Sequence, residues 1–449
     1  MTLTTSAPET SPAAADDGGA PVPAWRLLEP ALGEAVTLLV ALIVLLPLAM
    51  EWGLPSDVRD WNMRVNIAPF DMVLLVFPVW AFARRDRIRG LLGSRVARVV
   101  AGAHVAVFTA ALVVHPSWLG VALGARLVAG LAVIAALGVA LAVAEARSIV
   151  LGALAAAGAF QAVLAMVQSA QGHAFGLAPL DFAGPLYPFG SSLAGRGSLT
   201  HPYHLACFLI VAEVAALAGI RRARKPGLWL VALALMGAGL SVTYTRGGLI
   251  GQVALVACIL LGRADRRRTF AAAAVIALGL LVGGVAFGDG WVARADDSSS
   301  TATADSGRRE RFSEAIDLIE EQPAAGVGPG RYVTALHEGG QKGPLPAHNV
   351  VLHQAAELGL LGGLTTLALL ALLAWRTVRA GAWACALTVP LVPFLLLDAY
   401  PYVFPVGLAL SALWLGIVAD ACRSASGGPA DDPAEAEAGT QPAAVSPAR

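Results

Sequence analysis

A histidine and several arginines stand at the ends of long apolar segments, in a chain that otherwise carries few charges. The stretch PLPAHNVVLHQAAELGLLGG, residues 344–363, leads from a polar loop through His348 into an apolar helix. A histidine can remove a proton from a hydroxyl group near neutral pH, because its ordinary pKa is about 6.5. The sequence therefore indicates His348 as a candidate general base.

Three arginines could supply the complementary group, a binding site for phosphate. Arg196 lies in AGRGSLTHPYHLA, Arg246 in SVTYTRGGLIG and Arg308 in SGRRERFSEAI. A guanidinium group binds phosphate oxygens through two parallel hydrogen bonds and stays protonated. Two or three such groups could bind a pyrophosphate and stabilise it as a leaving group without a metal ion. The segments predicted to share their side of the membrane contain no Asp-x-Asp pair, so we predict no divalent-metal site there.

Each of these residues also has a simpler explanation. His348 could cap the helix that follows it, and Arg196 or Arg246 could anchor a helix end among lipid headgroups. His353 is expected to pack or hydrogen-bond between helices. Glu357 lies one turn later on the same helical face, where a bond to a neighbouring helix is as good an explanation as a role in the site. Solvent-exposed positions on the loop are expected for Arg309, Arg311 and Arg331.

Composition determines the kind of element that must position these residues. The chain has 449 residues, of which 57% are hydrophobic and 14% are charged. Soluble domains carry about 25% charged residues, so the deficit indicates an integral membrane protein. The formal net charge is zero, and we predict no nucleic-acid partner. The four cysteines lie in apolar segments or near the chain end, so we predict neither a disulfide nor a metal cluster.

Apolar runs of about 20 residues predict helices that can cross roughly 30 Å of hydrocarbon. Such runs occur at residues 32–50, 67–83, 97–114, 119–144, 148–170, 201–220, 227–244, 246–262, 270–287, 349–375, 382–398 and 403–421. Their glycines favour close helix packing in lipid. The predicted fold class is therefore an all-α integral membrane protein of about twelve transmembrane helices.

Basic residues determine the predicted orientation. The short connections RRDRIRGLLGSR, RRARK, RADRRR and RTVR, and the turn at Arg147, share one side, which is typical of the cytoplasmic side. The outer side then holds residues 171–200, the turn around Arg246 and a large, partly helical loop at 288–348. Within that loop we expect a flexible connector at 294–307, and then a short amphipathic helix closed by a Gly/Pro turn.

The two ends of the chain differ in composition from the middle. Residues 1–28 and 423–449 are rich in Ala, Pro, Ser and acidic residues, and we predict that both are disordered cytoplasmic tails. Residues 29–422 are predicted to form one membrane domain that includes the external loop.

Four motifs in a fixed order resemble those of one family. The pattern H-N-x-x-L-x-x-x-x-E-x-G-x-x-G begins at His348 and Asn349 and includes Glu357. It resembles the signature of the O-antigen ligase family, which also contains related polymerases. GRGSLTHPYHLA, SVTYTRGGL and GRRERFSEAI…PAAGVGPG resemble the family's other motifs, and Asp398 matches an aspartate-led segment before the last span. The chain departs from the pattern at Tyr203, Thr245 and Phe312, where the family usually has Asn, Ser and Trp.

The resemblance implies a GT-C-like glycosyltransferase that needs no metal ion or other cofactor. Such enzymes take a glycan from an undecaprenyl-pyrophosphate carrier at the outer face of the bacterial cytoplasmic (inner) membrane. They pass it to a hydroxyl group on a glycan, lipid or protein. Carried over to this sequence, Arg196 and Arg246 would bind the pyrophosphate, with Arg308 as a third ligand. His348 would act as general base or orient the acceptor. The supporting residues would be Asn349, Asp398 and Glu357.

Two alternatives remain open. A repeat-unit polymerase or a protein O-oligosaccharyltransferase of the same family would differ only in its acceptor. A transporter or flippase would move the lipid-linked glycan without chemistry, and we would then expect polar residues near the bilayer midplane. The ionisable residues gather instead on one predicted surface, which favours an enzyme.

Overall fold

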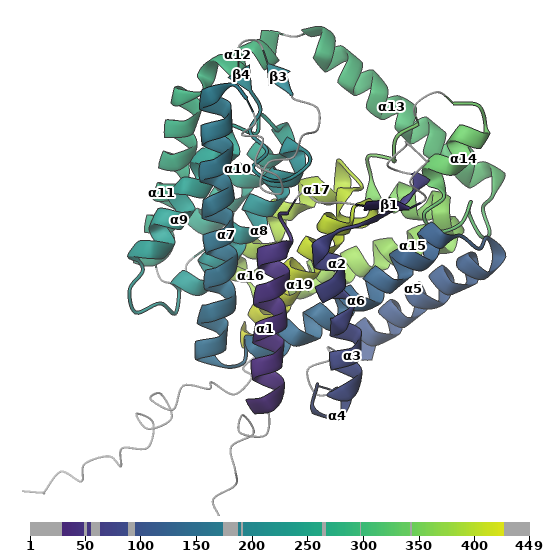
Figure 1. Cartoon of the computed structure of the whole chain (residues 1–449), viewed down its shortest axis with the longest axis horizontal. Coiled ribbons are helices and arrows are strands. Elements are labelled where there is room, and N and C mark those ends of the chain that lie inside the picture. The colour runs from purple at the N-terminus through teal and green to yellow at the C-terminus, as the bar shows by residue number, and fades with distance from the viewer. Residues whose placement is uncertain are drawn as a thin grey trace, which may run out of the picture.

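Helices make up nearly all of the computed structural model, which describes residues 29–48, 52–54, 63–88, 95–173, 187–189, 192–262, 266–296, 298–341 and 344–425 (Figure 1). The first helices are α1 (Glu29–Leu45), α2 (Pro69–Leu74), α3 (Val76–Ala83), α4 (Arg85–Ile88), α5 (Arg95–Val114), α6 (Trp118–Ala140) and α7 (Ala144–Gln171). Next come α8 (Pro202–Ile220), α9 (Gly227–Ser241), α10 (Arg246–Leu261), α11 (Arg266–Ala286), α12 (Gly288–Asp296), α13 (Ser298–Glu321) and α14 (Tyr332–Glu338). The last are α15 (Val350–Ala380), α16 (Ala382–Thr388), the 3₁₀ turn η3 (Val389–Leu391), α17 (Val392–Leu396), α18 (Tyr400–Val403) and α19 (Pro405–Ala425).

Strands occur only as two short antiparallel pairs in the described part of the chain. Strand β1 (Trp52–Leu54) pairs with β2 (Val65–Ile67), so that Trp52 lies opposite Ile67. Strand β3 (Pro188–Phe189) pairs with β4 (Ser192–Leu193). Both hairpins are accessory to the helical bundle.

Each apolar segment predicted from the sequence is helical. Seven helices are long and apolar enough to cross a membrane, and five shorter apolar helices of 10–17 residues account for the remaining segments. The five are Ala31–Leu45, Pro69–Ala83, Gly227–Ser241, Arg246–Leu261 and Ala382–Leu396. The all-α membrane class is therefore confirmed, whereas the number of crossings and the orientation stay predictions.

Prolines and one glycine interrupt several of these helices. The predicted segment 382–398 is divided into α16, η3 and α17, and Pro390 and Pro393 lie near the starts of η3 and α17. Proline has no backbone N–H to donate, so an α-helix cannot run through it unbroken. Helix α15 is interrupted at Gly359, where φ is 75° and ψ is −178°.

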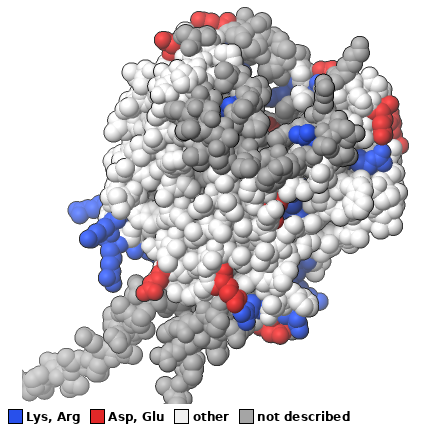
Figure 2. All heavy atoms as spheres, in the orientation of Figure 1, with Lys and Arg blue, Asp and Glu red and all other residues white. Residues whose placement is uncertain are grey.

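Helix α8 forms the centre of the bundle. It is buried on nearly every side and packs against α7, α9 and α19. A helix that is apolar all round is expected inside a membrane protein. Figure 2 shows a broad uncharged surface across the middle of the molecule, with charged side chains at its upper and lower margins. This arrangement suits a protein whose waist is surrounded by lipid.

The segment predicted to be external, residues 288–348, is more helical than expected. Helix α13 starts at Ser298, so the expected flexible connector at 294–307 is helical over most of its length, and that prediction was wrong. Serine, threonine and alanine all fit within a helix, and no proline lies between Ser298 and Glu321. In Figure 1, α13 runs across the top of the molecule from α12 towards α14.

The predicted tails lie largely outside the described residues. Residues 1–28 and 426–449 are not described, while helix α19 continues to Ala425, past the predicted boundary at residue 422.

A loop after α13 closes the interruption in α15. Three backbone hydrogen bonds of 2.9 Å join the two: Val327 N to Ala356 O, Gly328 N to Glu357 O, and Leu360 N to Pro323 O. A helix leaves carbonyl and N–H groups unpaired where it is interrupted, and the loop supplies their partners. The loop after α13 is therefore hydrogen-bonded to the backbone of α15.

Only glycine fits at this contact. A Cβ atom on Gly326 would overlap the backbone of Glu357, and one on Gly359 would overlap the carbonyl group of Ala324. Both glycines also have positive φ, which disfavours other residues. The P-x-x-G-x-G and E-x-G elements of the sequence thus meet each other in space.

Candidate functional site

His348 lies directly before α15 and beside Asp398, which lies just before α18. His348 Nδ1 is 3.7 Å from Asp398 Oδ2, and the two side chains are 32% and 24% exposed. Asp398 is held in place because its Oδ1 accepts a hydrogen bond from the Tyr400 N–H at 3.0 Å. The pair is in ion-pair range, slightly beyond a direct hydrogen bond, and is open to solvent. It could work as a base with an orienting carboxylate.

Asn349, and not His348, caps helix α15. Its Oδ1 accepts hydrogen bonds from the N–H groups of Val351 at 2.9 Å and Leu352 at 3.1 Å. Its Nδ2 donates to Leu396 O at 3.2 Å. A side-chain acceptor at this position satisfies N–H groups that the first turn of a helix leaves unpaired. Helix capping therefore does not account for His348.

Arg196 lies in a buried turn before α8 and is only 3% exposed. Gln168 of α7 holds the turn at both sides: its Oε1 accepts from Arg196 N at 3.3 Å, and its Nε2 donates to Gly197 O at 2.7 Å. Gly197 has φ of 61°, and a Cβ atom there would overlap Gln161 Oε1. The turn is thus fixed by polar side chains of α7, which position the arginine.

Charges from three parts of the chain act on His201, the residue that caps α8. Its Nδ1 accepts a hydrogen bond from Tyr203 N at 3.0 Å. Burial lowers the pKa of His201 to about 4; Asp398 opposes this, and Arg196 and Arg294 add to it. Electrostatic effects of this kind act over short distances inside proteins. The charges of Arg196 and Asp398 therefore both reach His201.

Tyr203 connects this region to Arg308 and to the start of α10. The charges of Asp398 and Arg308 both act on the Tyr203 side chain. A Cβ atom on Gly247 would lie 3.2 Å from the Tyr203 ring, so the first turn of α10, which begins at Arg246, packs against this tyrosine. The three arginines predicted to bind phosphate thus come from three separate elements around one region.

Glu357 has different surroundings. It is 1% exposed, and its carboxylate accepts hydrogen bonds from Tyr332 N at 3.3 Å and from the Tyr402 hydroxyl at 3.3 Å. His353 Nε2 lies 3.4 Å from the same carboxylate. Burial, and then the charge of Glu357, raises the pKa of Tyr402, so that hydroxyl stays protonated and can donate. Glu357 therefore joins α14, α15 and α18.

The remaining loop arginines differ in exposure. Arg309 is exposed. Arg311 is 14% exposed and pairs with Glu314 at 2.6 Å, so it does not face solvent as expected. Arg331, 29% exposed, lies 3.3 Å from Glu338.

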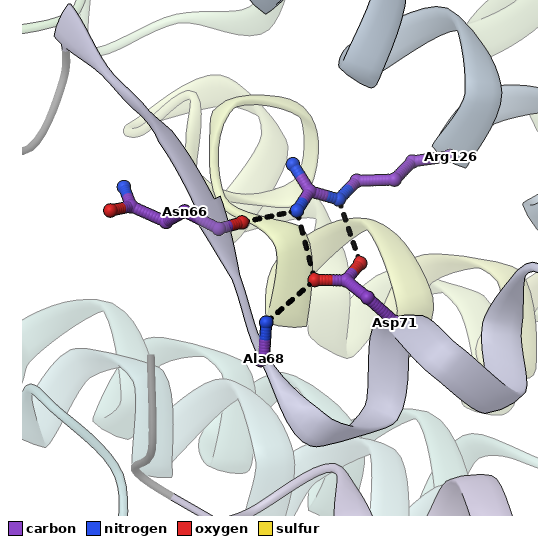
Figure 3. Close-up of polar contacts among 4 residues, drawn as sticks. All are labelled: Asn66, Ala68, Asp71 and Arg126. Carbon is purple, nitrogen blue, oxygen red and sulfur yellow. Dashed lines mark hydrogen bonds and ion pairs between the residues drawn. The ribbon is translucent and has the colours of Figure 1, made fainter. Parts of the chain in front are cut away.

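Arg126 and Asp71 form a buried ion pair that the motifs did not indicate (Figure 3). Arg126 Nε lies 2.8 Å from Asp71 Oδ1 and Nη2 lies 2.9 Å from Oδ2, while Nη2 also donates to Asn66 O. Asp71 Oδ2 accepts from Ala68 N at 2.8 Å. Both charges lie within predicted spans, where an ionisable residue is a functional candidate by default. That signal was present in the sequence.

Among the described residues, no group of three or more His, Cys, Asp or Glu side chains could hold a metal ion. Residues 231–367 match the family model described as O-Antigen ligase. The resemblance to the O-antigen ligase family is confirmed. The matched segment contains Arg246, Arg308, His348, Asn349 and Glu357. The residues outside it are Arg196 and Asp398.

Membership of this segment in the O-antigen ligase family has two direct consequences. The family consists of glycosyltransferase-like ligases and polymerases. Together with the long apolar helices, the match indicates an integral membrane protein. No match to a curated protein was found.

Proposed function

We propose that the protein transfers a glycan from an undecaprenyl-pyrophosphate carrier to an acceptor hydroxyl group at the outer face of the bacterial inner membrane. The observation that carries the proposal is the contact of His348 with Asp398, in a region where the charges of Arg196 and Arg308 also act. A base, a carboxylate that orients it, and guanidinium groups for a leaving pyrophosphate are what this reaction requires.

The chemistry follows from these groups. His348 removes the proton from the acceptor hydroxyl group while the hydroxyl oxygen forms a bond to the anomeric carbon of the donor glycan. The bond between that carbon and the pyrophosphate oxygen breaks, and the pyrophosphate leaves with the electron pair. Asp398 stabilises the imidazolium, which later loses its proton to solvent.

The arginines act on the leaving group. As the bond to the anomeric carbon breaks, negative charge develops on the pyrophosphate, and Arg196, Arg246 and Arg308 would bind that charge more tightly in the transition state than before it. Because guanidinium groups can neutralise this charge by themselves, we propose that transfer needs no divalent cation. The polyprenyl chain would remain among the apolar helices.

The decisive experiment is a transfer assay with purified protein in lipid nanodiscs. Donor glycan on undecaprenyl pyrophosphate and the cell's own membrane lipids are supplied, with EDTA present. We expect undecaprenyl pyrophosphate to be released and a new glycan conjugate to form. The rate should fall at least about 100-fold in His348→Ala, since a general base contributes that much. It should fall by about the same factor in Arg246→Ala, since one donor to a developing negative charge contributes about 100- to 1,000-fold.

Arg308→Ala and Arg309→Ala form a matched pair on α13. Both residues are exposed, and of the two only Arg308 acts electrostatically on Tyr203 within the described structure. Arg308→Ala should slow transfer, whereas Arg309→Ala should not. Equal rates in the two variants would remove Arg308 from the pyrophosphate site. In proteoliposomes, glycan that stays on its carrier while it crosses into the lumen would instead establish a transporter. The chemical identity of the conjugate distinguishes a ligase from a polymerase or a protein glycosyltransferase.

A further inference from the structure

A cavity lies beside α18, where two tyrosines of that helix reach different neighbours. Tyr400, the first residue of α18, stacks on His204 of α8 with 4.2 Å between ring centroids. Tyr402, on the same short helix, instead reaches Glu357 of α15 and lines a cavity of about 80 Å³. A buried water needs about 10–15 Å³ of such space, so the cavity has room for about five waters, or for part of a small polar ligand.

Arg126 presents fixed hydrogen-bond donors to this cavity. Its Nε and Nη2 atoms are bound by Asp71 and by the carbonyl group of Asn66, and the side chain lines the cavity. Figure 3 shows the third nitrogen, Nη1, turned away from both partners. Among the described residues, no hydrogen bond is made by that nitrogen, which leaves two N–H donors in a group that is only 12% exposed. Because the ion pair locks the guanidinium, these donors are already oriented for a ligand.

His353 adds a second unmatched group in the wall of the cavity. The residue is 2% exposed and its Nε2 faces Glu357. Its Nδ1 is buried and has no hydrogen-bond partner within the described structure. A buried polar atom normally has a partner, so one is missing here. A hydroxyl group would serve whether Nδ1 carries a proton or not, because it can both donate and accept.

Aromatic rings form the sides of the cavity. The rings of Tyr332 and His353 lie 4.7 Å apart, and those of His353 and Tyr402 lie 5.8 Å apart. Flat apolar faces beside fixed polar groups suit a ligand with an apolar face and hydroxyl groups at its edge. A sugar ring has this shape and chemistry.

We infer that the cavity between α6, α15 and α18 is a binding subsite for a sugar unit of the acceptor, with Arg126 and His353 as the groups that recognise its hydroxyls. The inference rests on the proposed function, since only a glycan transferase needs an acceptor site. Two helices that line the cavity, α15 and α18, begin just after His348 and Asp398, the proposed catalytic pair. His348 stands at the start of α15, five residues before His353, and Asp398 lies four residues before Tyr402.

The stereochemistry of an inverting displacement is compatible with an acceptor bound in this cavity. In a displacement that inverts the anomeric carbon, the attacking hydroxyl and its base lie on the face opposite the leaving group. The arginines come from α10, α13 and the turn before α8, whereas the cavity is lined by residues of β2, α6, α14, α15 and α18. His353 lies in the first turn of α15 and His348 lies two residues before that helix begins, so a sugar bound near His353 can place a hydroxyl of the adjoining unit at His348.

The test fills the cavity from α6 without touching the groups already discussed. Ala122 lines the cavity one turn before Arg126, whereas Ala125 is exposed on another face of the same helix. Ala122→Phe and Ala125→Phe are therefore a matched pair. Binding of glycan fragments released from the host envelope by mild acid is measured by saturation-transfer NMR on protein in nanodiscs. The transfer assay gives the KM values for acceptor and donor.

Ala122→Phe should weaken fragment binding and raise the acceptor KM at least tenfold, with the donor KM unchanged and with Ala125→Phe like the wild type. Fragment binding and acceptor KM unchanged in a folded Ala122→Phe protein would overturn the inference, as would the absence of fragment binding to the wild type. Should Ala122→Phe not fold, Ala122→Leu fills less of the space and is judged by the same criteria. Fragment binding that Ala122→Phe abolishes, in a wild type that transfers nothing, would refute the proposed function while leaving the sugar site standing.

Discussion

Replacing Asp398 by asparagine tests whether the carboxylate works through His348. Asparagine keeps the Oδ1 atom that accepts the Tyr400 N–H, so the local turn should survive and only the charge is removed. The expected loss comes from the imidazolium that forms when His348 takes the acceptor's proton. That cation now has a carboxylate at 3.7 Å to stabilise it.

The size of the effect follows from Coulomb's law. Two unit charges 3.7 Å apart attract by about 1.1 kcal/mol in water and by about 4.5 kcal/mol at an effective dielectric constant of 20. Since about 1.36 kcal/mol corresponds to a tenfold change in rate, these limits are about 6-fold and about 2,000-fold. The side chains are 32% and 24% exposed, which favours the lower part of that range. We expect kcat to fall about 10- to 100-fold.

The assay compares kcat for the wild type and the variants under saturating donor and acceptor. Asp420→Asn is the matched control. Like Asp398, Asp420 lies beside a basic side chain, Arg423 at 3.4 Å, but it lies near the C-terminal end of α19. It should retain wild-type activity. The double variant His348→Ala/Asp398→Asn should be no slower than His348→Ala alone, because residues that act as a unit are not additive. Full activity in Asp398→Asn, or a further loss in the double variant, would refute the coupling.

Three further predictions concern stability, measured by thermal unfolding of the protein in detergent. Asp71→Asn should reduce the free energy of unfolding by about 3 kcal/mol, since it leaves the buried Arg126 guanidinium without its charge partner. Gly326→Ala should cost at least about 2 kcal/mol, because φ is 64° there and the new methyl group would overlap the backbone of Glu357. Acid should destabilise the protein through His201, whose pKa falls from 6.5 in an unfolded chain to about 4 on folding. Between these pH values the unfolded state binds a proton that the folded state does not bind. The free energy of unfolding therefore has its full value above about pH 6.5 and decreases as the pH falls towards 4.

Each of these predictions has a control that separates its cause. Asp317→Asn, at an exposed position of α13, should leave the melting temperature unchanged. Gly340 also has positive φ, 88°, but has no atom within 4 Å of the place that a methyl group would take, so Gly340→Ala isolates backbone strain from overlap and should cost less than Gly326→Ala. His201→Asn retains a capping side chain but does not titrate, so it should flatten the acid dependence between pH 6.5 and 4. A slope that survives in His201→Asn would assign the acid dependence to another group.

Apolar length and motif order allowed much of the fold to be predicted, because both are local properties of the chain. Each span longer than about 18 apolar residues became a helix, as the bilayer requires. The breaks were less well predicted: Pro390 and Pro393 divided one segment, and Gly359 interrupts another, because loop atoms from residues 323–328 complete its hydrogen bonds.

Contacts between distant segments explain what the sequence did not indicate. Asp71 and Arg126 lie 55 residues apart, and only folding makes them partners. Glu357 lies within the same motif as His348, yet its bonds to Tyr332 and Tyr402 place it in a different environment. Sequence spacing indicates which residues share a helix, whereas the neighbouring helices determine what each one contacts.

The hydrogen bonds between the 323–328 loop and α15 also limit how related enzymes can exchange parts. A side chain on Gly326 or on Gly359 would need space that the backbone of the other segment already occupies, so neither segment is an independent module. A chimaera that takes only residues 288–348 from a relative would contain the relative's 323–328 loop without the interrupted helix to which that loop is hydrogen-bonded. To transfer the acceptor preference of a relative, a chimaera would have to take the whole chain from α13 through the first turns of α15 from that relative.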